Sequence, residues 1–180
     1  NPLQIRELGI RLSFVPEDRL GMGLVGGMDL VDNTMLRSYR HGHWIFLDRD
    51  RPRRLVEQMI HDLNIVTPGT GISVSKLSGG NVQKVLVGRE IALAPKVFMA
   101  AYPVRGLDIN TSYLIYNLLH KQKQSGIAVV YVGEDLDVLL ALCDRILVLC
   151  DGHVTGIVDA KKITKEEVGL LMTKHEVEEK

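Results

Sequence analysis

Apolar positions in the second half of the chain alternate between two spacings. Short apolar runs of strand length stand at 97–101, 127–132 and 145–149. Stretches with helical spacing precede these runs, at 81–93, 111–124 and 136–142. Strands that alternate with helices of this length predict parallel strands covered on both faces by helices.

The first half is less regular. A weakly alternating run at 9–15 ends at Pro16, which predicts a short strand leading into a turn. The Gly-rich stretch 20–28 predicts a flexible loop. Residues 53–63 have the spacing of an amphipathic helix, and a polar connector follows at 67–75.

The C-terminal part has the pattern of a hairpin. Asp151-Gly152 is a strong two-residue turn between the runs 146–150 and 153–158, so we expect an antiparallel edge pair. A surface helix is predicted for 163–172.

Composition narrows the class of protein. The chain has 180 residues, 46% of them hydrophobic, which predicts one soluble globular domain with a single core. Basic and acidic residues number 22 each, so no long-range field favours nucleic acid or an anionic membrane. The longest apolar runs are far below the ~20 residues that span a bilayer. Cys143 and Cys150 lack CxxC spacing, which indicates reduced core thiols.

The string LSGGNVQK, residues 77–84, stands directly before a predicted helix. Ser78 is well placed as the N-cap, and Gly79 and Gly80 would let a ligand approach bare N–H groups at the positive helix end. This arrangement suits a phosphate, although a plain Ser-Gly-Gly helix entry remains the alternative. The string resembles the signature loop of ATP-binding-cassette (ABC) ATPases. In that family the loop touches the γ-phosphate of ATP held by the opposing domain, which implies nucleotide-binding roles for Ser78, Gly79, Gly80, Asn81 and Gln83.

Other motifs follow in the family's order and spacing. Residues 97–108, VFMAAYPVRGLD, resemble a Walker B strand and a D-loop, with Asp108 as the D-loop aspartate. Residues 130–137, VYVGEDLD, occupy the place of the switch loop. Upstream, FVPEDR resembles the Q-loop variant of the second cassette in tandem monosaccharide and nucleoside importers, with Glu17 at the Q-loop position.

The resemblance covers nearly the whole chain and implies its fold. We expect an α/β fold of the ABC ATPase type within the P-loop NTPase class, with a mostly parallel sheet flanked by helices and a small helical subdomain. Residues 1–180 would be the C-terminal part of one nucleotide-binding domain. About 31–75 and the signature helix would form the helical subdomain, and about 95–160 the core sheet and helices. No GxxxxGK(S/T) string occurs, and because the family's P-loop lies upstream of VPEDR, we expect a truncated fold and a piece of a longer protein.

Three departures from the family pattern concern chemistry. The Walker B Asp and Glu positions hold Ala101 and Tyr102, and the switch-loop His position holds Glu134. A methyl group cannot orient a hydrated magnesium ion, and a phenol with an ordinary pKa near 10 is a poor base at neutral pH. A carboxylate at Glu134 would repel the γ-phosphate. We therefore expect no intact catalytic residue, no metal ligand and no activity of the chain alone.

The resemblance implies the second cassette of a tandem ATP-binding subunit in an importer for a monosaccharide or nucleoside. This cassette would complete the ATP site of a partner cassette, with ATP and Mg²⁺ as cofactors of the full assembly and none bound tightly here. Expected partners are a second nucleotide-binding domain, transmembrane permease subunits and, indirectly, an extracytoplasmic substrate-binding protein, but no nucleic acid. The expected location is the cytoplasmic face of the cell membrane. The open alternative is a non-catalytic regulatory or scaffolding domain with an ABC fold that binds a protein partner.

Two further clusters are weighed and set aside. His41-Gly42-His43-Trp44 has two His without further ligands, which predicts an exposed loop and not a metal site. The run Arg49, Arg51, Arg53 and Arg54 is interleaved with acidic residues, so a salt-bridged helix entry is favoured over a nucleic-acid site.

Overall fold

The computed structural model describes residues 1–39 and 47–173 and divides into two compact units, Asn1–Val132 and Gly133–Lys180. Each unit has its own cluster of buried hydrophobic side chains. The expected single core is therefore wrong for the described residues. The physical reason is that the strands of the second unit bury their apolar side chains against that unit's own helices.

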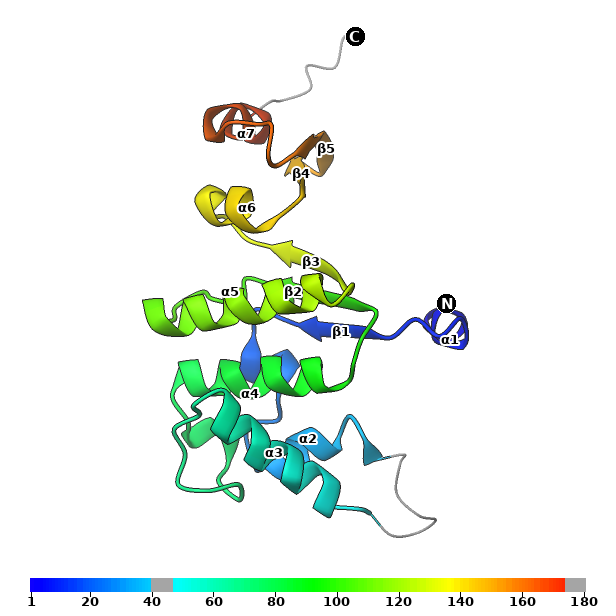
Figure 1. Ribbon diagram of the computed structural model, residues 1–180, viewed down its shortest axis with the longest axis vertical. Helices are drawn as coiled ribbons and strands as arrows, with labels where there is room; N and C mark the ends of the chain where they lie inside the picture. Colours follow the sequence, from blue (N-terminus) through cyan, green and yellow to red (C-terminus); the bar gives the residue numbers. More distant parts are fainter. Residues whose placement is uncertain (40–46, 174–180) are drawn as a thin grey trace. The chain divides into compact units, whose positions relative to one another are not determined.

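A three-stranded parallel sheet forms the centre of the first unit (Figure 1). Its strands are β1 (Leu12–Val15), β2 (Val97–Ala101) and β3 (Ala128–Val132), in that spatial order. Phe14 pairs with Met99, and Met99 pairs with Val130. The predicted parallel pairing is confirmed for 97–101 and 127–132, whereas the run 145–149 pairs antiparallel with the segment that follows it.

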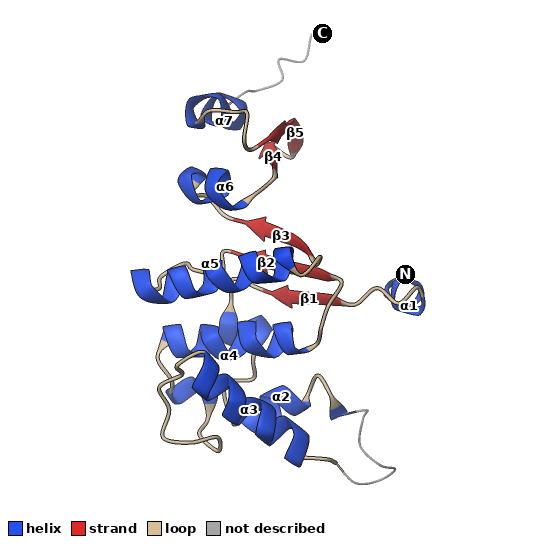
Figure 2. Ribbon diagram, viewed as in Figure 1, coloured by secondary structure: helices blue, strands red, loops and turns tan. Residues whose placement is uncertain are grey.

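Helices cover one face of this sheet (Figure 2). The helices α4 (Gly79–Ala92) and α5 (Ile109–Gln124) pack on the side where Val15, Phe98 and Ala100 are buried. Both crossovers advance in the same direction along the sheet, and right-handed crossovers of that kind place their helices on one side. Alternate residues on the other face are 39 to 51% exposed, namely Leu12, Phe14, Val130 and Val132. Within the first unit, the helices α4 and α5 therefore cover one face of the sheet and leave these four side chains partly exposed.

Short helices fill the rest of the first unit. They are α1 (Pro2–Glu7), the π-helix η1 (Arg19–Gly23), α2 (Leu30–Met35), α3 (Asp50–Asp62) and the 3₁₀ turn η3 (Val74–Lys76). The helix predicted at 53–63 is confirmed as α3. The loop predicted at 20–28 is wrong in its first part, because the Asp18 carboxylate accepts hydrogen bonds from the N–H groups of Leu20 (3.3 Å) and Gly21 (2.8 Å) and so starts η1.

The second unit contains a helix, a hairpin and a further helix. These are α6 (Leu136–Leu142), β4 (Arg145–Cys150), β5 (His153–Asp159) and α7 (Lys165–Met172). The antiparallel pair is confirmed, and its turn residues Asp151 and Gly152 have the positive φ values, 49° and 80°, of a two-residue hairpin loop. Cys143 and Cys150 are half-buried and not disulfide-bonded. None of the helices described in either unit is long and apolar enough to cross a bilayer.

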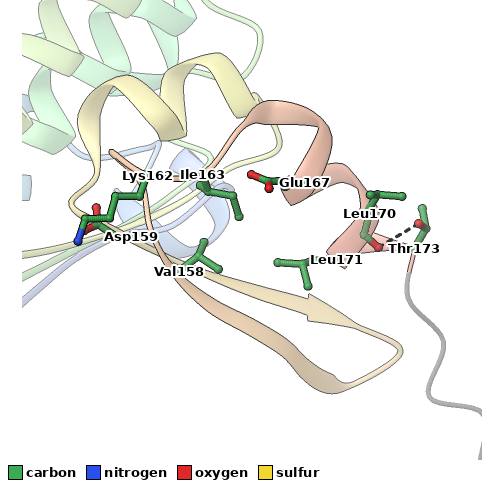
Figure 3. A pocket seen from close by; sticks show the side chains of 8 residues that line it. All are labelled: Val158, Asp159, Lys162, Ile163, Glu167, Leu170, Leu171 and Thr173. Carbon is green, nitrogen blue, oxygen red and sulfur yellow. Dashed lines mark hydrogen bonds and ion pairs between the residues drawn. The ribbon is translucent and has the colours of Figure 1, made fainter.

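A hollow of about 850 Å³ lies beside α7 in the second unit (Figure 3). Its lining is mostly apolar and includes Val158, Ile163, Leu170 and Leu171. The one basic residue of the lining, Lys162, lies 3.4 Å from the carboxylate of Asp159. Because the Lys162 ammonium is already paired with the Asp159 carboxylate, the hollow has little attraction for a phosphate.

Candidate functional site

The first turn of α4 is held by its capping residue. Ser78 has extended backbone angles, and its Oγ accepts hydrogen bonds from the backbone N (3.5 Å) and the Nδ2 (2.9 Å) of Asn81. The Asn81 Oδ1 accepts from the backbone N of Val66 at 3.0 Å, which ties the helix start to the preceding connector. The N–H groups of Gly79 and Gly80 are first-turn donors that an α-helix leaves without a backbone acceptor. The predicted N-cap role of Ser78 is confirmed.

The start of α5 lies beside this turn. Asp108 caps α5 and accepts hydrogen bonds from the Oγ1 (2.7 Å) and the backbone N (2.9 Å) of Thr111. A Cβ added to Gly80 would lie 3.4 Å from Thr111 Oγ1 and 3.7 Å from Asp108 Oδ2. The side-chain and backbone hydrogen bonds from Thr111 hold the pKa of Asp108 below its usual value. Two positive helix ends and one exposed carboxylate therefore meet at Gly80.

Arg19 connects this region to the segment that follows β1. Its Nε donates to Gln83 Oε1 at 2.8 Å, and its Nη2 donates to the backbone carbonyl of Arg105. Burial lowers the pKa of Arg19, which nevertheless stays a cation at neutral pH. Gln83 is fully buried, and its Nε2 has no hydrogen-bond partner among the described residues. An unpaired buried polar group of this kind costs about 1–3 kcal/mol.

The end of β2 is built from different groups. Ala101 ends the strand, and Tyr102 follows in the left-handed region with φ 47°, donating its N–H to the Val132 carbonyl at 2.8 Å. A left-handed conformation costs a non-glycine residue about 1–2 kcal/mol. The Arg105 guanidinium lies 5.8 Å from the centre of the Tyr102 ring and forms an ion pair with Glu17. A methyl group, an aromatic ring and the ion pair of Arg105 with Glu17 are therefore the groups found at and beside the end of β2.

These groups do not fit a magnesium ion. Within residues 1–39 and 47–173, no group of three or more His, Cys, Asp or Glu side chains could hold a metal. The carboxylate of Glu17, at the predicted Q-loop position, already forms an ion pair with the Arg105 guanidinium. The start of α4 does fit an anion, because Gly79 is exposed and a Cβ added to it would lie 3.5 Å from Arg19 Nη1.

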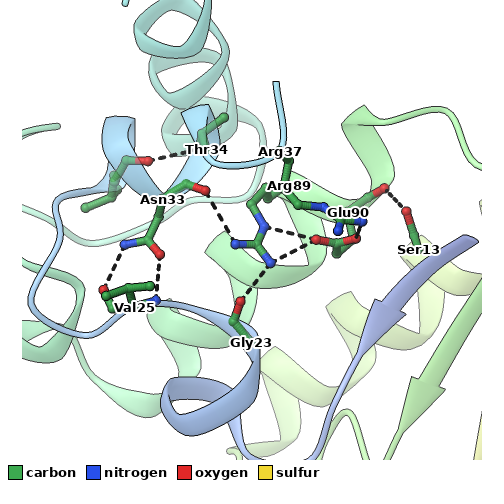
Figure 4. A network of polar contacts seen from close by, with 9 residues as sticks. Ser13, Gly23, Val25, Asn33, Thr34, Arg37, Arg89 and Glu90 are labelled. Carbon is green, nitrogen blue, oxygen red and sulfur yellow. Dashed lines mark hydrogen bonds and ion pairs between the residues drawn. The ribbon is translucent and has the colours of Figure 1, made fainter. Parts of the chain in front are cut away.

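A buried charge network anchors the other end of α4 (Figure 4). The Glu90 carboxylate is 1% exposed and accepts from Arg37 Nη2 (2.9 Å) and Arg89 Nε (3.0 Å). Arg89 Nη2 also donates to the Gly23 carbonyl at 2.8 Å, and Ser13 Oγ donates to the Glu90 carbonyl at 2.8 Å. Burial is the main cause that lowers the pKa of Arg89. The network joins α4 to β1, to η1 and to the segment after α2.

The structure brings together part of the predicted site. Ser78, Gly79, Gly80, Asn81 and Asp108 lie in one cluster, and Gln83 and Glu17 reach it through Arg19 and Arg105. Glu134 lies in the second unit, exposed, one residue before the α6 cap Asp135.

Sequence reasoning missed Arg19, Arg105 and Thr111 as contributors to this cluster. Arg19 and Arg105 stand inside the motifs VPEDR and VRGLD. Their place in those strings is the only sequence signal that could have found them.

The structure describes the arginines at 49–54 but not the histidine cluster at 41–44. His41, His43 and Trp44 lie outside the described residues. Arg49 is ion-paired with Asp32 at 2.6 Å, without the geometry of a hydrogen bond, and lies 3.6 Å from Asp29. Arg51 lies 3.6 Å from Asp48. The prediction of salt bridges at this helix entry is confirmed for Arg49 and Arg51, although the Arg49 partners come from α2 and its cap.

The chain is similar in sequence to known ATP-binding proteins. No protein-family model matches the chain. It is 38% identical over 157 residues to the xylose import ATP-binding protein of Moorella thermoacetica, covering 87% of this chain and 31% of that protein. It is 34% identical over 174 residues to the nucleoside import ATP-binding protein of Lactococcus lactis subsp. cremoris, covering 95% and 34%. The chain spans about a third of the length of these curated relatives.

Solved structures show the same fold. A dimeric ATP-binding cassette in a post-hydrolysis state bound to ADP and Pi superposes with TM-score 0.72 at 22% identity, covering 91% of this chain and 69% of that one. A dimeric bacterial ABC transporter cassette superposes with TM-score 0.71 at 25% identity, covering 89% and 67%. The fold is that of an ABC ATPase, and the chain is homologous over about nine-tenths of its length to ATP-binding proteins for the import of sugars and nucleosides.

Proposed function

We propose that this chain is the second cassette of a tandem ATP-binding subunit in an ABC importer for a monosaccharide or nucleoside. In this role it donates the loop at Ser78–Gly80 to ATP held by a partner cassette. The relatives support the class, because their names describe ATP-binding proteins that import xylose, ribose, galactose or nucleosides.

The observation that carries the proposal is the start of α4 beside Asp108. The exposed first turn presents the N–H groups of Gly79 and Gly80 at a positive helix end, next to the hydroxyl of Ser78. Such donors favour the charge that develops on a transferring phosphoryl group. Asp108, placed against Gly80, would relay between the two ATP sites of a cassette pair.

The chain's own nucleotide chemistry is limited by the end of β2. Ala101 supplies no ligand for magnesium, and Tyr102 supplies no base at neutral pH. Glu134 at the switch position adds a negative charge where the family contacts the γ-phosphate. ATP and Mg²⁺ therefore belong to the full assembly and bind weakly or not at all to this cassette alone.

The remaining partners follow from the same proposal. Residues from about 31 to 75 would dock transmembrane permease subunits, and an extracytoplasmic substrate-binding protein would deliver the sugar or nucleoside. The cassette would work at the cytoplasmic face of the membrane.

Gly79→Asp tests this proposal. An acidic residue in the first helical turn favours the helix, and the new Cβ would lie in ordinary contact with Arg19, so the variant should fold normally. The new carboxylate would repel a phosphate. We expect ATP turnover of the assembled two-cassette ATPase to fall by about 100-fold, the loss typical of one missing donor.

Gly27→Asp is the matched control, because nothing lies within 4 Å of a Cβ at this exposed glycine. It should leave turnover unchanged. Normal turnover in Gly79→Asp would overturn the proposal and favour a scaffolding domain that binds a protein partner without using ATP.

A further inference from the structure

Three segments far apart in the sequence converge on the side chain of Arg19. Arg19 itself begins η1, Gln83 lies in the second turn of α4, and Arg105 lies in the loop between β2 and α5. The partners are separated from Arg19 by 64 and 86 positions. Both contacts stay within the first unit.

The chemistry of arginine makes this connection stiff. A guanidinium group is planar and holds its N–H donors in a fixed fork. Because Nε binds Gln83 and Nη2 binds the Arg105 carbonyl, α4 and the loop after β2 are held at a set distance through one rigid group. The third corner, Nη1, lies next to Gly79.

Gln83 gives independent support. It is fully buried, its Oε1 accepts from Arg19, and its Nε2 bonds to nothing among the described residues. A leucine of similar size would fill the same space and would bury no unpaired donor. The polar contribution of Gln83 here is to accept the hydrogen bond from Arg19.

We propose that Arg19 is a positioning residue that fixes the first turns of α4 against the loop that carries Asp108. The inference rests on the proposed function for its role in ATP turnover. Arg19 acts through the backbone: it keeps the N–H groups of Gly79 and Gly80 in register with Asp108 when the loop meets a phosphate of a partner cassette.

Amide hydrogen exchange in the 180-residue chain tests the positioning directly. The reporters are the Val82 amide, which bonds to the Ser78 carbonyl, and the Leu107 amide, which bonds to the Val104 carbonyl. Arg19→Met keeps the aliphatic stem and removes both hydrogen bonds. We expect exchange at both reporters to rise about tenfold, while the Leu63 amide at the end of α3 is unchanged. The control Arg54→Met, at an exposed arginine of α3, should alter none of the three.

Two variants of Gln83 separate positioning from general stability. Gln83→Leu removes the acceptor together with the unpaired donor, so it should loosen Val82 and Leu107 without lowering the melting temperature. Gln83→Glu keeps an acceptor for Arg19 and should hold both reporters within about twofold of the wild type. Unchanged exchange at Val82 and Leu107 in both Arg19→Met and Gln83→Leu would overturn the inference.

Turnover of the assembled ATPase distinguishes the two proposals. Arg19→Met should lower kcat about tenfold with little change in KM for ATP, because the loop is mispositioned in the transition state. If Gly79→Asp leaves turnover intact while Arg19→Met loosens both reporters, the proposed function fails and the positioning stands. If Gly79→Asp abolishes turnover while Arg19→Met changes neither exchange nor kcat, the positioning fails alone.

Discussion

The start of α4 and the end of β2 lie in the same unit and are built in opposite ways. At the start of α4, Ser78 and Asn81 hydrogen-bond each other and leave the Gly79 backbone exposed. At the end of β2, Ala101 carries no polar side-chain group, and Tyr102 lies in a left-handed conformation under Arg105. One region has the donors that an anion needs, and the other lacks the ligands that a metal needs.

The two regions also differ in the ion pairs that hold them in place. Helix α4 is anchored by the buried pair of Glu90 and Arg89, whose side chains are 1% and 7% exposed, and Glu90 also pairs with the more exposed Arg37. The loop after β2 is held by the ion pair of Glu17 and Arg105, whose side chains are 47% and 60% exposed. Buried ion pairs are costly to break and exposed ones contribute little. The helix that Ser78 caps is therefore fixed by buried groups, whereas the loop after β2 is held by an exposed pair.

The largest expected effect comes from Glu90→Leu. This change leaves Arg89 and Arg37 without their carboxylate, and breaking a buried pair in this way costs about 3–5 kcal/mol. Urea unfolding should show that loss. The exposed Glu57→Leu on the neighbouring α3 should stay within about 0.5 kcal/mol of the wild type. A loss below about 1 kcal/mol for Glu90→Leu would mean that α4 is not anchored by this network.

Ser78→Ala should have the next largest effect. It removes the oxygen that accepts from Asn81, and loss of such an N-cap costs about 1 kcal/mol. Thermal unfolding measures the change. Ser125→Ala, at the exposed C-terminal end of α5, serves as the control and should cost less. Equal stability of Ser78→Ala and the wild type would show that the start of α4 does not depend on its cap.

The contribution of Asp108 should depend on pH. Its folded-state pKa is lowered by hydrogen bonds from Thr111, so its stabilising contribution is fully present above the usual carboxyl value of 3.8 and is lost as pH falls through the folded pKa. Thr111→Val removes the hydroxyl donor. Carboxyl titration by NMR should place the pKa of Asp108 closer to 3.8 in the variant. An identical titration in both proteins would contradict the arrangement beside Gly80.

The smallest effect is expected at the exposed pair. A double-mutant cycle with Glu17→Gln and Arg105→Gln should give a coupling below about 1 kcal/mol that weakens with added salt. Chemical unfolding of the four proteins provides the values. A coupling above about 2 kcal/mol would mean that the exposed pair stabilises its loop much as the buried pair stabilises α4, which would contradict the comparison.

The elements that could be predicted have clear periodicity and punctuation. The strand 97–101 and the helix 136–142 occur with the predicted bounds, since apolar spacing and flanking turn residues are local signals. The helices α1 and α2 have six residues each, too few for a period to show. The π-helix η1 starts with hydrogen bonds to the Asp18 side chain. The face of the sheet on which α4 and α5 pack is set by the direction of both crossovers.

The candidate site likewise contains local contacts that could be predicted and long-range contacts that could not. The sequence predicts the cap Ser78, because a cap accepts hydrogen bonds within three residues of itself, whereas it predicts Asp108 only as the D-loop aspartate of the resemblance and not as the cap of α5. The contacts of Arg19 with Gln83 and of Arg37 with Glu90 could not, because they join positions 64 and 53 residues apart. No local pattern encodes that proximity.

We propose that this chain completes an ATP site held by a partner cassette and does not turn over ATP itself. Calorimetry and a phosphate-release assay on the 180-residue chain with Mg-ATP test it most directly. We predict no hydrolysis and a Kd of ~1 mM or weaker, about 4 kcal/mol of binding free energy at most. Micromolar binding or measurable turnover by the chain alone would contradict the account of Ala101, Tyr102 and Glu134.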